Sequence, residues 1–145
     1  MRGPNHDLDF KVARIQLRFI MHMLHHASFA ISDFARSAVF YDATLSALGY
    51  VRVWEHKTEV GYGSPGGGDK FAIKLGSSGQ AVPGEGFHIA FSAPSREAVE
   101  AFYKAAIANG GKDNGGSGLH PEYGQSYYAA FVFDPDGYRI EAVIN

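Results

Sequence analysis

The chain has 145 residues, 46% of them hydrophobic, with a formal net charge of −2 and no cysteine. This length and apolar content predict one ordinary soluble domain with a single core. The absence of cysteine excludes disulfides, thiolate metal sites and a cysteine nucleophile, so a bound metal would need His, Asp or Glu ligands. The 13 Lys and Arg residues are scattered along the chain, which argues against nucleic acid as a partner.

The first 22 residues form an N-terminal extension, and the predicted domain spans 23–145. No apolar run reaches the roughly 18 residues of a membrane helix, and no signal-peptide core is present. We therefore expect a cytoplasmic protein without a membrane partner. Polar and apolar residues alternate from Arg14 to Phe19, which predicts an extra strand. Alternatively, this extension lies upstream of a natural start at Met21 or Met23.

The chain contains an internal repeat, with units at about 24–82 and 86–145. Aligning the segment His26 to Phe29 with the segment His88 to Phe91 also aligns the Phe-Tyr pairs at positions 40–41 and 102–103. Further along, 69–75 match 136–142 at a slightly longer spacing, which sets Lys74 opposite Glu141.

Each unit is predicted to begin with a strand and to continue with a helix. The alternation places His26 and His88 on the less apolar face of their strands. Ser32 and Ser95 are the predicted helix caps, and glycines end both helices. About three strands follow in each unit, which makes the fold α+β. The later strands are expected at Tyr50–Glu55, Thr58–Gly63, Phe71–Gly76, Tyr127–Phe133 and Tyr138–Ile144.

An approximate twofold axis between the units would bring His26, His88, Lys74 and Glu141 together. Two imidazoles and one carboxylate suit a divalent metal with open coordination positions. Such an ion can chelate a substrate through two oxygens, stabilise an enolate or activate dioxygen. Protonated Lys74 cannot be a ligand: its stem carries the charge away, or it pairs with Glu141 in place of a metal, or it binds an anionic substrate.

Three further residues are expected to line a substrate pocket together with Lys74. Tyr127 and Tyr128 lie in an alternating strand, so one of them faces the cavity, and Tyr128 is favoured. His120 and Tyr123 lie in a Gly-rich segment from Gly110 to Gln125, which is predicted to be a loop that closes over the site.

The sequence resembles the vicinal oxygen chelate superfamily, which groups glyoxalases, extradiol dioxygenases, and bleomycin and fosfomycin resistance proteins. The resemblance covers Leu24 to Ile144, and its most specific part is the closing segment from Phe133 to Val143. It implies two paired βαβββ modules that form an open, cup-shaped mixed sheet with helices on the outside.

The resemblance also implies a metal site at His26, His88 and Glu141. Glyoxalase-type members supply a fourth ligand where this sequence has Lys74, which departs from a glyoxalase I pattern. A homodimer is implied as well, with modules that pair within one chain or between chains.

Three functions follow as hypotheses. The first is a metal-dependent lyase or dioxygenase-like enzyme that chelates a small oxygen-bearing substrate on Fe, Mn, Ni, Co or Zn. The alternative is a metal-free protein that binds or sequesters a small molecule, as bleomycin resistance proteins do; Lys74 opposite Glu141 and the aromatic content motivate it. The third is an oligomerisation or scaffold domain.

Overall fold

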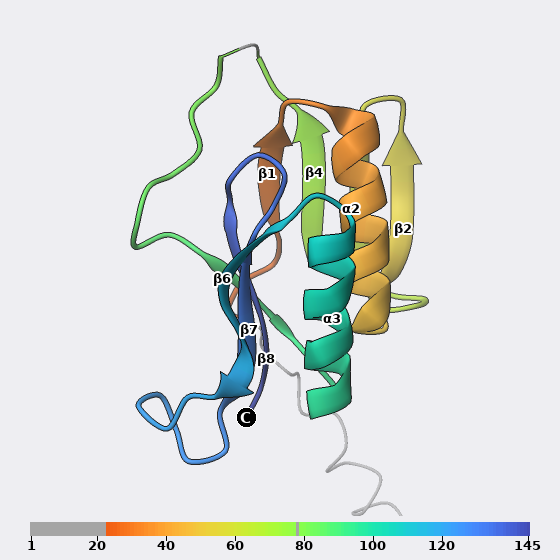
Figure 1. Cartoon of the computed structure of the whole chain (residues 1–145). Coiled ribbons are helices and arrows are strands. Elements are labelled where there is room, and N and C mark those ends of the chain that lie inside the picture. The colour runs from red at the N-terminus through yellow and green to blue at the C-terminus, as the bar shows by residue number, and fades with distance from the viewer. Residues whose placement is uncertain (1–22, 78) are drawn as a thin grey trace, which may run out of the picture.

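The computed structural model describes residues 23–77 and 79–145, and it contains two successive modules of the same order (Figure 1). The strand proposed near Arg14 lies outside the described residues. The first module contains β1 (Ala27–Ile31), α2 (Phe34–Ala47), β2 (Val51–His56), β3 (Glu59–Gly63) and β4 (Phe71–Leu75). The second contains β5 (Ile89–Ser92), α3 (Arg96–Ala108), β6 (Lys112–Leu119), β7 (Tyr128–Phe133) and β8 (Arg139–Ile144).

Each module folds into its own four-stranded mixed sheet, in the order β1-β4-β3-β2 and β5-β8-β7-β6. The strands after each helix follow one another through short turns and pair antiparallel. The first strand of each module pairs parallel with the last. The α+β class and the two βαβββ modules are thereby confirmed.

The helix caps follow the sequence pattern with one difference. Ser95 caps α3 as predicted, and its side chain accepts a hydrogen bond from the Ala98 amide at 3.1 Å. The cap of α2 is Asp33, which accepts from the Arg36 amide at 3.0 Å. Ser32, the predicted cap, donates instead to the Asp136 carboxylate in the turn before β8.

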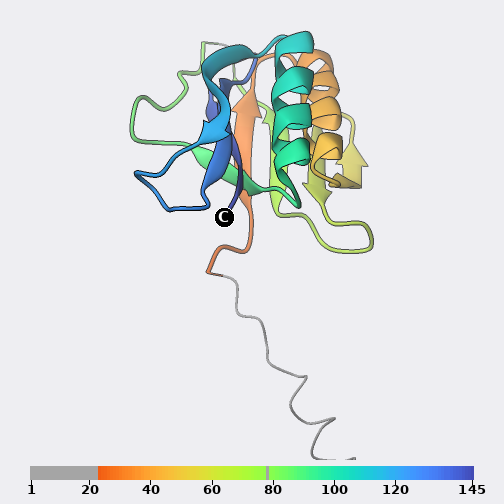
Figure 2. The ribbon, with the colours of Figure 1, turned by 60° about the horizontal axis from the view of Figure 1, so that its bottom comes forward.

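The two modules share one core on the helix-facing sides of their sheets. The rings of Phe29 and Tyr138 stack with centroids 4.0 Å apart, and the rings of Phe71 and Phe91 meet edge to face at 5.1 Å. The helices α2 and α3 lie side by side over this core (Figures 1 and 2). Each helix covers its own sheet, and the face of a sheet opposite its helix is its outward face.

The segment from Gly110 to Gln125 is not the open loop that we predicted, because half of it forms β6. Its residues lack an apolar alternation, but the strand pairs with β7 along its length. A bulge between Asp113 and Gly116 interrupts the pairing. There the Asp113 carboxylate accepts hydrogen bonds from the backbone amides of Gly115 and Gly116. Gly116 has φ +58°, a conformation that favours glycine.

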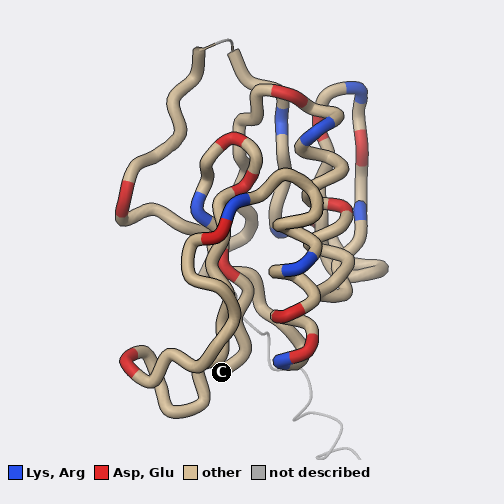
Figure 3. The backbone as a smooth tube through the Cα atoms, in the orientation of Figure 1, with Lys and Arg blue, Asp and Glu red and all other residues tan. Residues whose placement is uncertain are grey.

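Basic and acidic residues are distributed over several elements of both modules (Figure 3). This distribution agrees with the scattered charge in the sequence. Within 23–77 and 79–145, no helix has both the length and the apolar character required to cross a bilayer.

Candidate functional site

A buried carboxylate on the outward face of the second sheet is the centre of the candidate site. Glu141 lies in β8 and is 1% exposed, between Ile140 and Ala142, which face the helix and belong to the shared core. Its Oε2 atom lies 3.0 Å from Nε2 of His88, and its Oε1 atom accepts a hydrogen bond of 2.5 Å from the hydroxyl of Tyr127. Both carboxylate oxygens therefore have a partner from another segment of the same module.

Tyr127, and not Tyr128, faces this carboxylate. The Tyr128 hydroxyl donates to Glu100 on α3 at 2.7 Å, and the Arg96 guanidinium lies 5.0 Å from the Tyr128 ring. Tyr128 was the residue favoured for the cavity, but adjacent residues of a strand point to opposite faces, so a register uncertainty of one residue exchanges them. Burial and the hydrogen bond to Glu141 raise the pKa of Tyr127 to about 12, so its hydroxyl remains a donor at neutral pH.

His120 and Tyr123 extend the same face beyond Tyr127. The ring centroid of Tyr123 lies 5.4 Å from that of Tyr127 and 6.0 Å from that of His120. His120 in turn meets Phe131 of β7 at 5.1 Å. Two predicted pocket residues, His120 and Tyr123, therefore lie near Glu141, with Tyr127 between them and the carboxylate. Tyr127 itself was not the favoured pocket residue. We refer to His88, His120, Tyr123, Tyr127 and Glu141 as the Glu141 cluster.

His26, the third predicted ligand, does not join this cluster. Its Nδ1 atom lies 2.8 Å from Nδ1 of His25, and both residues precede the first residue of β1. Strand alternation does not constrain these two side chains, because both residues lie outside β1. Within the described part of the chain, no three His, Asp or Glu side chains are arranged to hold one metal ion.

Lys74 also lies apart from Glu141. Its Nζ atom is 3.8 Å from Oε2 of Glu59 on the neighbouring strand β3, and its side chain is half exposed. A direct ion pair with Glu141, which one of our hypotheses required, is therefore absent between these two residues. Lys74 instead makes a cross-strand pair, an interaction that contributes little to stability when it is exposed.

The strand register changes which residue corresponds to Glu141 in the first module. Ala27 pairs with Phe71, whereas its counterpart Ile89 pairs with Ile140. The counterpart of Glu141 is therefore Ala72, and not Lys74 as the sequence alignment suggested. The alignment slipped by two positions because the turns before β4 and β8 differ in length, and such a slip keeps each residue on the same face of its strand.

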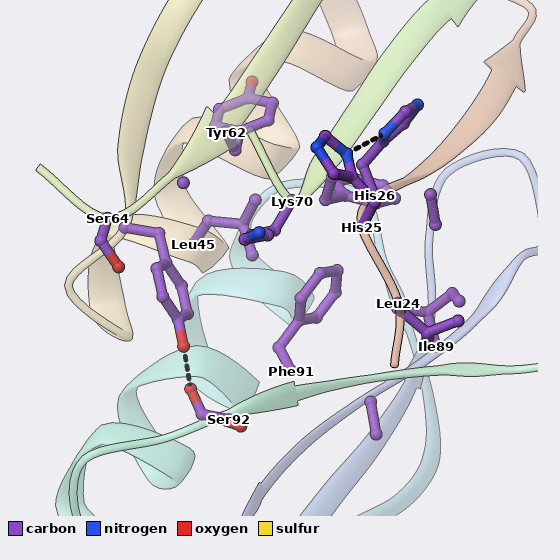
Figure 4. Close-up of a pocket in the computed structure, with 15 residues that line it drawn as sticks. Leu24, His25, His26, Leu45, Tyr62, Ser64, Lys70, Ile89, Phe91 and Ser92 are labelled. Carbon is purple, nitrogen blue, oxygen red and sulfur yellow. Dashed lines mark hydrogen bonds between the residues drawn. The ribbon is translucent and has the colours of Figure 1, made fainter. Parts of the chain in front are cut away.

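A cleft of about 410 Å³ lies between the two modules (Figure 4). It is bordered by the segment before β1, the end of α2, the turn between β3 and β4, and the strand β5. His25 and His26 line it, whereas His88, Tyr127 and Glu141 do not.

The Glu141 cluster provides some, but not all, of the ligands that a metal ion requires. An imidazole nitrogen and a carboxylate oxygen at 3.0 Å are donors that divalent transition metals accept. Tyr127 provides the type of outer hydrogen bond that orients a ligating carboxylate. The residues thus fit a metal ion in part, and a third protein ligand has to come from outside the Glu141 cluster.

Comparisons with known proteins agree with this fold. The sequence-family model of the Glyoxalase/Bleomycin resistance protein/Dioxygenase superfamily matches residues 23–142 of this chain. A glyoxalase/bleomycin resistance protein from Albidiferax ferrireducens is 35% identical with a TM-score of 0.74, and the match covers 84% of this chain and 98% of that one.

Two more distant structures share the fold. A glyoxalase-related enzyme from Fulvimarina pelagi is 22% identical, with a TM-score of 0.65 over 86% of this chain and 89% of that one. A fosfomycin resistance protein from Listeria monocytogenes is 18% identical, with a TM-score of 0.61 over 87% of this chain and 95% of that one. Curated proteins give no match to this sequence. The family match over most of the chain shows that this protein belongs to the Glyoxalase/Bleomycin resistance protein/Dioxygenase superfamily.

Proposed function

We propose that the protein is a metal-dependent enzyme that acts on a small oxygen-bearing molecule. The observation that carries this proposal is the contact of His88 with the buried carboxylate of Glu141 on an outward face. The proposed ligands are His26, His88 and Glu141, and the ion is Fe, Mn, Ni, Co or Zn. The proposed reaction is that of a glyoxalase-like lyase or of a dioxygenase-like oxidoreductase. The proposed location is the cytoplasm.

The third ligand, His26, comes in this proposal from a second copy of the chain. In the described part of one chain His26 contacts His25 and joins no group of three possible ligands with Glu141, which disfavours a site built from both modules of one chain. A symmetric homodimer can bring the first module of one copy to the second module of the other. Two equivalent sites would then form at the interface.

The roles of the side chains follow from their positions. A divalent ion bound here would polarise substrate oxygens as a Lewis acid. His88 and Glu141 would hold it, and Tyr127 keeps the carboxylate oriented through its hydrogen bond. Tyr123 and His120 border the same face, where they would contact the substrate.

A metal-free binding protein is the alternative function. Its motivation was the aromatic content and the position of Lys74 opposite Glu141. Lys74 instead contacts Glu59, and Glu141 contacts His88 and Tyr127. The geometry therefore favours the metal-dependent enzyme.

The first experiment measures the metal content of protein purified without a nickel column. We expect one divalent ion per chain, a loss in the variants H26A, H88A and E141Q, and no loss in E97Q, which changes an exposed helix residue. Absence of metal, together with no thermal stabilisation by any of the five ions, would contradict the proposal.

The second experiment tests the origin of His26 by mixing variants. A dimer of one H26A chain and one E141Q chain keeps one intact site if ligands come from both copies, and none if they come from one. After unfolding and refolding an equal mixture, random pairing of symmetric dimers restores about a quarter of the wild-type sites. No recovery in a mixture that has refolded to dimers would contradict the interchain site.

A further inference from the structure

The cleft between the modules has the size and position of a ligand site. Its volume of about 410 Å³ lies within the range of small-molecule pockets in proteins. It lies against β1 and β5, each of which is an edge strand of its sheet. Edge strands leave one row of backbone hydrogen-bonding groups without a partner in the sheet, so a ligand between them can be bound by the main chain.

The floor of the cleft is apolar and belongs to the core. Leu45, Phe71 and Phe91 line it, and each is buried. Because these side chains are packed against the core, the floor is a preformed surface for an apolar group.

Two hydrogen bonds hold the walls in place. The Tyr50 hydroxyl donates to the carbonyl of Ser92 at 2.7 Å, which links the first module to β5 across the cleft (Figure 4). The Tyr62 hydroxyl donates to Asp42 at 2.9 Å. A site with fixed walls loses less entropy when a ligand binds.

The charge of the cleft is complementary to an anion. Its lining contains Lys70, His25 and His26 but no Asp or Glu. In the described part of the chain Lys70 forms no ion pair, unlike Lys74, which contacts Glu59. Lys70 thus provides a positive charge at the edge of an apolar floor, and no carboxylate of the described residues forms an ion pair with it.

We propose that this cleft binds a small organic acid with an apolar body, whose carboxylate pairs with Lys70 and whose body packs on Leu45, Phe71 and Phe91. The proposal does not require a bound metal: of the three proposed ligands only His26 lines the cleft, whereas His88 and Glu141 do not. The site would serve as a second binding site, for a substrate portion or for an effector of this chemical class.

The test is calorimetric titration of the full-length protein with naphthoate and with its uncharged isostere naphthamide, in the presence of a metal chelator. We expect naphthoate to bind about tenfold more tightly than naphthamide, which corresponds to one charge-assisted contact. Equal affinities, or no binding of naphthoate, would overturn the proposal.

Variants separate the cleft from other surfaces. K70Q should weaken naphthoate binding about tenfold and leave naphthamide unchanged, while K104Q, at an exposed position on α3, should change neither. S64W adds bulk to the cleft from an exposed loop position and should weaken both ligands. Unchanged naphthoate affinity in K70Q would overturn the proposal.

E141Q distinguishes this site from the Glu141 cluster. Naphthoate should bind E141Q and the chelated wild type with the same affinity, even if E141Q has lost its metal. Loss of naphthoate binding in E141Q that still has the wild-type fold would assign the ligand to the Glu141 cluster and overturn a separate site. Failure of the metal proposal would leave this result unaffected.

Discussion

The hydroxyl of Tyr127 donates a hydrogen bond of 2.5 Å to Oε1 of Glu141, while Nε2 of His88 lies 3.0 Å from Oε2 of the same carboxylate. The carboxylate is almost completely buried, so its orientation depends on these two partners. Of the two, Tyr127 would act on a bound metal only through Glu141, and we regard it as a positioning residue for the proposed site.

Replacing Tyr127 with phenylalanine should weaken metal binding by about tenfold, because the carboxylate loses the bond that orients it. The measurement is a titration of apo-protein with cobalt or zinc, followed by calorimetry. Y128F is the matched control, since it removes a hydroxyl that bonds to Glu100 on the helix side. If Y127F binds metal as tightly as Y128F and wild type, Tyr127 has no positioning role.

The raised pKa of Tyr127 predicts a specific pH dependence of stability. The folded protein keeps this proton up to about pH 12, whereas an unfolded tyrosine loses it near pH 10.0. The resulting stabilisation is therefore complete below pH 10 and is lost as the pH rises through about 12. Urea unfolding of wild type and Y127F across this window should show a smaller loss of stability in the variant. Parallel curves would exclude a role for Tyr127 in this dependence.

The sequence was sufficient to predict the modules because their signals are local. Alternating apolar residues marked the strands, and the cap at Ser95 marked a helix end. The strand β6 escaped prediction because its residues are mostly glycine and polar, so its conformation comes from pairing with β7. Local propensity carries no signal for such a strand.

For the site, the sequence predicts only those features that follow from strand alternation. Glu141 lies between Ile140 and Ala142, which belong to the core, so strand alternation alone is sufficient to place it on the opposite face of β8. Strand register decides whether Tyr127 or Tyr128 faces the site, and it also decides which residue corresponds to Glu141. Turns of unequal length shift this register. The separation of His26 from Glu141 depends on how two modules pack, and no short-range pattern contains that information.

Replacing Ser37 with alanine should increase stability, against the usual direction for a buried substitution. Ser37 lies inside α2, and its hydroxyl is buried without a hydrogen-bond partner among the described residues. Removing an unpaired buried hydroxyl avoids its desolvation cost of about 1 kcal/mol or more. S46A is the control, because Ser46 lies in the same helix but is exposed, and it shares the gain in helix propensity. Thermal unfolding should rank S37A above S46A, and the reverse order would contradict this account.

Asp134 should be essential for the stability of the turn between β7 and β8. Its carboxylate is 2% exposed and accepts bonds from the Tyr41 hydroxyl at 2.6 Å and from the amides of Asp136 and Tyr138 at 2.9 Å. D134A leaves these donors unpaired and should cost about 3 kcal/mol. D134N keeps an acceptor for both amides, so urea unfolding should show a loss of about 1 kcal/mol or less. An equal loss in both variants would mean that the acceptor does not matter.

Asp134 also has a predicted effect at acid pH. Burial raises its pKa above the usual 3.8, although the hydrogen bonds from Tyr41 and the turn amides oppose this. The favourable effect of the protonated form is therefore present below pH 3.8 and is lost as the pH rises through the folded pKa. Comparison of D134N with wild type should show this component missing from the variant, and identical pH profiles would contradict the assignment.

The stacked pair of Phe29 and Tyr138 should make the two modules unfold together. Phe29 lies in β1 and is buried, and its ring lies 4.0 Å from that of Tyr138 in the second module. F29A removes this contact and should cost about 3 to 5 kcal/mol. V39A, at an exposed position on α2, is the control and should have a small effect.

Cooperativity is measured by two probes, one in each module: Trp54 fluorescence reports on β2, and amide hydrogen exchange in α3 reports on the second module. Because both modules use one core, F29A should shift both probes by the same free energy. If exchange in α3 stays at the wild-type rate while Trp54 shifts, each module has its own core and the shared-core description is wrong.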